Sequence, residues 1–118
     1  MEAGAAILVV ENDCFIAFDL ENILVAAGYR VLGSVGTYDK AVRLVASTCP
    51  QVAIVDYRLD GGNSGVKLAQ QLRTLGTKII YMTGSAEEVR RADPGAEVLA
   101  KPFEPGDLLE AIDRLLSV

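Results

Sequence analysis

The feature that most constrains the fold is a regular alternation between two kinds of segment. Short apolar runs rich in β-branched residues alternate with longer segments whose apolar residues recur at helical spacing. The short runs predict buried strands at 6–10, 30–35, 52–56, 78–83 and 96–100. The longer segments predict helices at 13–27, 38–48, 64–75 and 104–117, with one short helix between Ser85 and Pro94. Strands that alternate with helices form a parallel sheet covered on both faces, because right-handed crossovers place helices there.

A chain of 118 residues suits one domain and can bury a sufficient core without disulfides. We therefore predict a single domain over residues 1–118, with no second domain within it. It would be a stand-alone protein or a piece of a longer one. Five strands favour an α/β, flavodoxin-like (βα)5 sandwich with strand order 2-1-3-4-5. Gly33 interrupts the second strand, which is therefore expected at an edge of the sheet.

Charge and composition exclude several classes of function. The formal net charge is −5, and an acidic surface disfavours nucleic-acid binding, which needs clustered Lys and Arg. The chain has no histidine and only Cys14 and Cys49, so a Cys/His zinc site is excluded and a reduced, cytoplasmic setting is the simpler reading. Residues 3–10 are apolar but too short to span a bilayer, and Glu2 precedes them where a signal peptide is positive. No membrane association is expected.

Polar residues gather where the predicted strands end. In an open α/β sheet, ligands bind at the carboxyl ends of the strands, near the switch point between the first and third. The residues placed there are Glu11, Asn12, Asp13, Asp56, Thr83 and Lys101. Carboxylates, a hydroxyl and a lysine are therefore expected to converge on one rim of the sheet.

This set of groups suits phosphoryl transfer. Oxygen ligands without histidine suit Mg²⁺, a hard cation that prefers carboxylates and keeps several waters. Asp56 can attack a phosphoryl group and give an acyl phosphate. Lys101 can pair with one phosphoryl oxygen, and Thr83 can donate a hydrogen bond to another.

Four segments, in this order on these strands, resemble the receiver domain of two-component response regulators: ILVVEND (7–13), VAIVDYRL (52–59), MTG (82–84) and KPF (101–103). The resemblance implies that a histidine kinase or a histidine phosphotransfer protein phosphorylates Asp56, with Thr83 and Lys101 as catalytic partners. It also implies Mg²⁺ at Glu11, Asn12, Asp56 and the backbone carbonyl of Arg58. A cis peptide before Pro102 is implied as well.

The chain departs from that family pattern in four places. Asn12 stands where the pattern has a second acid, and Val98 replaces the aromatic of the fifth strand. Asp60 takes the place of a proline, and Gly65 falls one residue late. The segment between Thr83 and Lys101 is about one helical turn short, and its MTGSA is similar to a subgroup with a reduced fourth helix. We expect that segment, 84–95, to carry the signal in place of the aromatic.

Three alternatives stay open at this point. Asn12 weakens the metal site, so the chain is alternatively a pseudo-receiver, an interaction module that is not phosphorylated. A small nucleotide- or flavin-binding protein of the same fold is a second rival. Phe15 and Phe18 fall off the apolar stripe of the helix at 13–27, so they either dock the histidine-bearing partner or pack against the last helix.

Local patterns also predict how helices begin. Asp13 precedes the first helix, where a carboxylate caps free amides, and capping is favoured over metal ligation for it. Thr37 is placed to cap the second helix. Asn63 or Ser64 is placed to cap the third. Ser85 and Glu88 have the spacing of a capping box for the short fourth helix.

Overall fold

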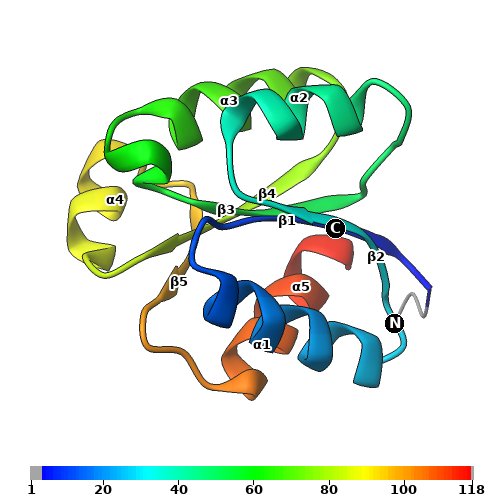
Figure 1. The fold of residues 1–118 in the computed structure, drawn as a ribbon. Coiled ribbons are helices and arrows are strands. Elements are labelled where there is room, and N and C mark those ends of the chain that lie inside the picture. Colours follow the sequence, from blue (N-terminus) through cyan, green and yellow to red (C-terminus); the bar gives the residue numbers. More distant parts are fainter. Residues whose placement is uncertain (1–3, 118) are drawn as a thin grey trace.

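The structure is a computed structural model, and it describes residues 4–117. Five parallel strands form one sheet in the order β2-β1-β3-β4-β5 (Figure 1). The strands are β1 Ala6–Val10, β2 Arg30–Val35, β3 Val52–Asp56, β4 Lys78–Thr83 and β5 Glu97–Ala100. The helices are α1 Cys14–Ala26, α2 Tyr38–Val45, α3 Ser64–Thr74, α4 Ala86–Ala92 and α5 Pro105–Leu116, with a 3₁₀ turn, η1, at Leu59–Gly61. The predicted flavodoxin-like fold and strand order are confirmed.

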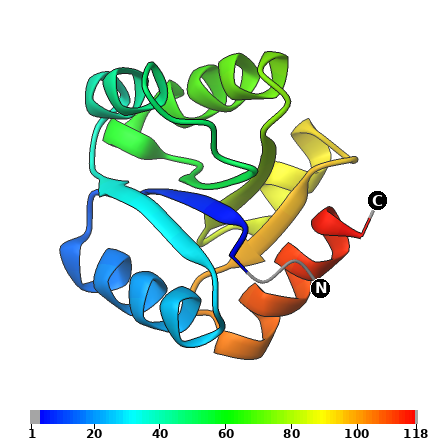
Figure 2. The ribbon, with the colours of Figure 1, turned by 90° about the vertical axis from the view of Figure 1, so that its right-hand side faces the viewer.

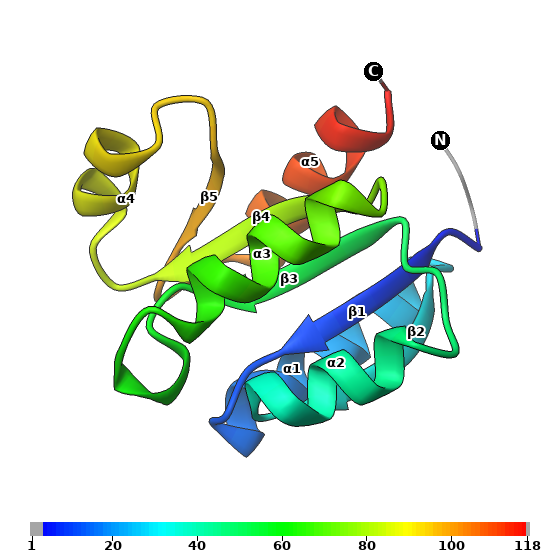
Figure 3. The same cartoon turned by 90° about the horizontal axis from the view of Figure 1, so that it is seen from above.

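Helices cover both faces of the sheet. Figure 2 shows α1 and α5 below the twisted sheet and α2 and α3 above it. Viewed from above, α2 and α3 lie over the strands, whereas α4 sits to one side, beside β5 (Figure 3). Among residues 4–117, no helix combines the length and the hydropathy needed to cross a bilayer.

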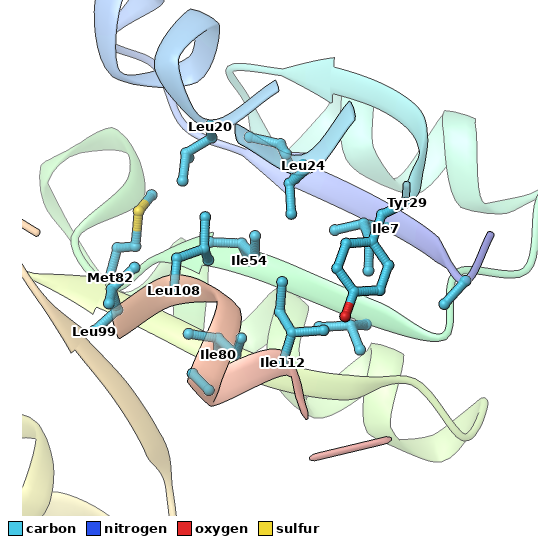
Figure 4. Packing of buried hydrophobic residues seen from close by; sticks show 14 of the residues in the cluster. Ile7, Leu20, Leu24, Tyr29, Ile54, Ile80, Met82, Leu99, Leu108 and Ile112 are labelled. Atoms are coloured by element: carbon cyan, nitrogen blue, oxygen red, sulfur yellow. The ribbon is translucent and has the colours of Figure 1, made fainter. Parts of the chain in front are cut away.

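The strands are buried on both faces, which explains their continuous apolar sequences. Because side chains alternate along a strand, Ile7, Ile54 and Ile80 join the core under α1 and α5 (Figure 4). Leu8 and Val55 join the opposite core, under α2 and α3. The two cores hold the sheet rigidly between two helical layers, so its strand ends form a fixed platform.

The edge strand β2 carries the irregularity that its glycine suggested. The pairing with β1 shifts by one residue, from Ile7–Val31 to Leu8–Gly33. A Cβ at position 33 would lie 2.5 Å from Leu44 Cδ2, so glycine lets α2 pack closely on this edge.

Helix ends show where local patterns succeed and where they fail. Asp13 accepts hydrogen bonds from the amides of Phe15 and Ile16, and Thr37 accepts one from the amide of Lys40, so both predicted caps are confirmed. Helix α2 ends at Val45, earlier than predicted. The hydroxyls of Ser47 and Thr48 both donate to the carbonyl of Leu44, and they close the helix there.

Two predicted caps are wrong. Asn63 occupies the N-cap position of α3, but no side chain makes a capping hydrogen bond there. Ser85 occupies the N-cap of α4, and its side chain makes no capping bond either. Glu88 does not complete a capping box, because it forms an ion pair with Arg58 from the segment after β3. A tertiary partner has taken the carboxylate that the local pattern assigned to the helix end.

Candidate functional site

The carboxyl ends of four neighbouring strands bring the predicted site residues together. Glu11 follows β1, Asp56 is the last residue of β3, and Thr83 is the last residue of β4. Lys101 follows β5, and its amide donates to the carbonyl of Thr83 at 2.7 Å. Parallel register aligns these strand ends, with Asp56 opposite Met82 and Thr83 opposite Ala100. Parallel strands place their carboxyl ends at one edge, so the rim predicted from the sequence is present.

One lysine bridges two nearly buried carboxylates at this rim. Lys101 Nζ lies 3.0 Å from Glu11 Oε1 and 3.6 Å from Asp56 Oδ2. Glu11 and Asp56 are only 3% and 8% exposed, whereas the lysine side chain is 24% exposed. Carboxylates this well buried need a counter-charge, and the ammonium supplies it.

The remaining carboxylate oxygens face different partners. Glu11 Oε2 accepts the amide of Asp13 at 2.9 Å, and Asp56 Oδ1 accepts the amide of Arg58 at 3.2 Å. Glu11 Oε1 is buried and has no hydrogen-bond partner of suitable geometry within residues 4–117, so its approach to Lys101 Nζ is a purely ionic contact. An acceptor left in this condition retains lone pairs for another ligand.

The donor set fits a hard cation, with less charge than a full acidic cluster. Glu11 and Asp56 supply carboxylate oxygens, and the carbonyl of Arg58 follows in the same segment. Within residues 4–117, no three Asp, Glu, His or Cys side chains converge as a metal-binding group. Asn12 is exposed, and its side chain makes no hydrogen bond or ion pair in the described part of the chain. Its role as a ligand stays a prediction.

Thr83 links the site to the start of α4. It is only 4% exposed, and its Oγ1 accepts the amide of Ser85 at 2.9 Å. A hydroxyl that accepts one hydrogen bond still has its own proton to donate. The Lys101–Pro102 peptide bond is cis, as the sequence resemblance implied.

Gly65 packs against the backbone of Asp56. A Cβ at this position would lie 2.2 Å from the Asp56 carbonyl oxygen and 3.0 Å from that of Tyr57. Only glycine allows the first turn of α3 to approach the end of β3 this closely. From the sequence, Gly65 was singled out only because it lies one residue later than the glycine of the family pattern. The glycine in a run of small residues after Asp56 was the available signal.

The aromatic side chain paired in register with Val98 of β5 is a buried tyrosine. Val98 pairs with Tyr81 of β4 and is partly buried against the core under α2 and α3. Tyr81 is 2% exposed, and its ring lies edge-on to Tyr57 with centroids 5.2 Å apart. Burial raises the pKa of the Tyr81 hydroxyl. This tyrosine is held in the core.

The two predicted docking residues are exposed. Phe15 and Phe18 on α1 are 80% and 63% exposed, so the alternative that they pack against the last helix is wrong. Phe18 borders a hollow of about 320 Å³ between α1 and β2, which Glu11 and Asn12 also line. The apolar surface therefore adjoins the acidic rim.

A family model described as "Response regulator receiver domain" matches residues 7–113. The chain is 31% identical to the phyllosphere-induced regulator PhyR of Methylorubrum extorquens, with 98% of the chain and 45% of the relative covered. It is 30% identical to the transcriptional regulatory protein PdtaR of Mycobacterium tuberculosis, with 94% and 56% covered. The chain thus spans about half the length of these relatives.

Solved structures agree over nearly whole chains. A putative response regulator from Chloroflexus aurantiacus superposes with a TM-score of 0.81 at 27% identity, covering 98% of this chain and 99% of that one. The signal receiver domain of a modulated diguanylate cyclase from Desulfovibrio desulfuricans superposes with a TM-score of 0.85 at 31% identity, covering 97% and 94%.

Proposed function

Because the chain belongs to the response regulator receiver domain family, we propose that it accepts a phosphoryl group on Asp56 and relays the signal through altered protein contacts. The observation that carries the proposal is the bridge from Lys101 to both Glu11 and Asp56 at the carboxyl end of the sheet. The family match gives no support to a flavin- or nucleotide-binding role, the other expectation for this fold.

The phosphoryl donor would be a phosphohistidine of a histidine kinase or a histidine phosphotransfer protein. A carboxylate oxygen of Asp56 attacks the phosphorus, and the phosphorus–nitrogen bond breaks with its electron pair going to the imidazole. The product is an acyl phosphate on Asp56 and a free histidine on the donor. Since Asp56 attacks as a carboxylate, no general base is required.

Two side chains would assist this transfer. Lys101 already contacts Asp56 Oδ2, so its ammonium can pair with an oxygen of the transferring group and offset the charge that develops there. Thr83 uses Oγ1 as an acceptor for Ser85, which leaves the hydroxyl proton for another phosphoryl oxygen.

Glu11, Asn12, Asp56 and the carbonyl of Arg58 would hold Mg²⁺ at the same rim. Support comes from the buried Glu11 Oε1, which has no hydrogen-bond partner among residues 4–117, and from a donor set made only of oxygens. When bound, the ion neutralises charge on the phosphoryl oxygens during transfer. The residues of the chain position the carboxylate of Asp56 and keep it largely buried.

The exposed pair Phe15 and Phe18 would dock the histidine-bearing partner, because it lies next to the acidic rim where the donor must approach. The chain matches about half the length of two relatives that are named as regulators. We therefore expect the altered contacts to be made with a regulatory protein or domain. We place the protein in the cytoplasm, in keeping with the free thiols of Cys14 and Cys49.

Intact-mass spectrometry after incubation with acetyl phosphate and Mg²⁺ tests the proposal. The wild type should gain the mass of one phosphoryl group, and Asp56→Asn should gain none. Asp60→Asn is the matched control, because Asp60 is an exposed acid four residues later, and asparagine tolerates its φ of 59°. Phosphoryl mass found on an aspartate of the Asp56→Asn variant would refute the assignment of Asp56 as the phosphorylation site.

Two observations favour a second candidate function. The exposed amide of Asn12 and the lack of a three-acid cluster within residues 4–117 are what a pseudo-receiver would show. In that case, neither acetyl phosphate nor a phosphorylated histidine donor would add mass to the wild type. The chain would then act as an interaction module without phosphorylation.

A further inference from the structure

An ion pair joins the two segments that leave the sheet beside Asp56. The guanidinium of Arg58 pairs with the carboxylate of Glu88 on α4. Arg58 follows Asp56 by two residues, and its amide donates to Asp56 Oδ1 at 3.2 Å. Glu88 belongs to the helix that follows Thr83, the hydroxyl residue at the end of the neighbouring strand. The ion pair therefore connects the phosphoacceptor segment to α4.

Few other interactions hold α4 in place. The helix has seven residues, and Val89 is its only buried one. Its N-cap, Ser85, makes no side-chain capping bond and is held through its amide, which donates to Thr83 Oγ1. Asp93, at the C-cap, contacts Arg73 of α3 at 3.5 Å. Loss of the Glu88 contact would leave α4 anchored mainly through Val89 and its two ends.

We propose that Arg58 exchanges partners when Asp56 is phosphorylated. In the resting protein the guanidinium pairs with Glu88 and ties α4 to the segment after β3. In the phosphorylated protein the guanidinium binds oxygens of the phosphoryl group, and Glu88 and α4 are released. This exchange rests on the proposed phosphorylation of Asp56.

The charges favour this exchange. A phosphoryl group carries a charge of about −1.5 to −2 and three strong acceptor oxygens, whereas Glu88 offers a single negative charge. A guanidinium binds phosphoryl oxygens with two parallel hydrogen bonds. The present pair is exposed, with 57% of the Arg58 side chain and 40% of the Glu88 side chain accessible, and such pairs are weak and readily exchanged.

The same phosphoryl group would also recruit the hydroxyl of Thr83, which holds the amide of Ser85. Phosphorylation would thus act on both links between α4 and the rim, one at the start of the helix and one at Glu88. This route needs no aromatic on β5, where the chain has Val98. It assigns the moving part to residues 84–95, a segment in which Val89 is the one buried side chain.

Amide hydrogen exchange on the unphosphorylated protein tests whether the Arg58–Glu88 ion pair holds α4 in place. Glu88→Gln should make the amides of 86–92 exchange about threefold faster, which is the effect of losing one exposed ion pair. Glu87→Gln is the matched control, because within residues 4–117 the ion pair of Glu87 is with Arg90 of the same helix, at 3.8 Å, and not with another element. Equal amide exchange rates in the two variants would show that the Arg58–Glu88 ion pair does not hold α4.

Beryllofluoride binding in the presence of Mg²⁺ tests the exchange itself, since this probe mimics a phosphoryl group on an aspartate. Glu88→Gln should tighten binding about threefold, because Arg58 no longer has to leave a partner. Arg58→Gln should weaken binding about fivefold, because a charge-assisted contact is lost. Combined with Arg58→Gln, Glu88→Gln should have no effect of its own.

The outcomes separate this inference from the proposed function. If the wild type takes up phosphoryl but the two substitutions act additively, the exchange is wrong and phosphorylation of Asp56 stands. If the wild type neither gains phosphoryl mass nor binds beryllofluoride, the proposed function and the exchange both fail. In that event, the amide-exchange comparison still decides whether Glu88 ties α4 to Arg58.

Discussion

Replacing Lys101 with methionine should show how strongly the ammonium stabilises the rim. Methionine keeps most of the side-chain length but removes the charge that Glu11 and Asp56 face at 3.0 Å and 3.6 Å. With an effective dielectric of about 20, each contact represents roughly 5 kcal/mol of gross attraction. Most of this attraction is offset by the cost of desolvating the charges, and the lysine is 24% exposed. We expect a net loss of about 2 kcal/mol, since pairs buried completely lose roughly 3–5 kcal/mol when one partner is removed.

Thermal unfolding measures this loss directly. For a domain of this size, about 2 kcal/mol corresponds to a fall in Tm of roughly 8 °C. Mg²⁺ should restore part of it, because the ion replaces the missing positive charge. At a Mg²⁺ concentration about tenfold above its Kd, roughly 1.4 kcal/mol should return. Lys40→Met is the matched control, because Lys40 is exposed and forms no ion pair in the described part of the chain.

A double variant tests whether the lost stability comes from the unpaired carboxylates. Lys101→Met combined with Glu11→Gln should regain at least half of the lost stability, since one of the two carboxylates no longer needs a counter-charge. Glutamine still offers an oxygen to the amide of Asp13, which Glu11 holds at 2.9 Å. If Lys101→Met unfolds within about 1 °C of the wild type, the lysine does not stabilise the acidic pair and the reasoning is refuted.

Three further predictions concern other parts of the site. Asn12→Asp should tighten Mg²⁺ binding about tenfold, or 1.4 kcal/mol, whereas Asp13→Ala should cost about 1 kcal/mol of stability as a lost cap. Titration calorimetry that found Mg²⁺ binding abolished in Asp13→Ala and unchanged in Asn12→Asp would reverse these roles. The double variant Phe15→Ala, Phe18→Ala should keep its Tm and its reaction with acetyl phosphate, yet accept phosphoryl more slowly from its kinase; an unchanged transfer rate would contradict docking there. Gly65→Ala should destabilise the protein by roughly 1–3 kcal/mol in urea unfolding, because its Cβ would overlap the phosphoacceptor's carbonyl oxygen; a midpoint equal to that of the wild type would contradict the close approach.

Much of the fold could be predicted because its signals are local and repeated. Continuous apolar runs at 52–56 and 78–83 matched β3 and β4 to the residue, since central strands of a parallel sheet are buried on both faces. The caps at Asp13 and Thr37 followed from short-range hydrogen bonding. The rim could be predicted from topology, because parallel strands deliver their carboxyl ends to one edge.

Predictions failed where a distant residue competed for a side chain. The expected capping box of α4 lost Glu88 to Arg58, thirty residues away in sequence. Glu110 and Arg114 of α5 also have the one-turn spacing of an intrahelical ion pair, yet Arg114 contacts Glu97 of β5 at 2.7 Å. Both local patterns were sound, but an oppositely charged residue of another segment approached closely enough to take one partner.

The amino-acid sequence alone predicted the order of the elements, the apolar runs that form buried strands, and the four strand ends that carry Glu11, Asp56, Thr83 and Lys101. These properties depend on the periodicity of apolar residues and on the order of strands and helices along the chain, and both can be read from the sequence. Packing of the helices onto the sheet determines which carboxylates Lys101 bridges, why residue 65 must be glycine, and that Glu88 reaches Arg58. Those choices depend on distances between segments far apart in the chain, and they are set when the helices pack onto the sheet.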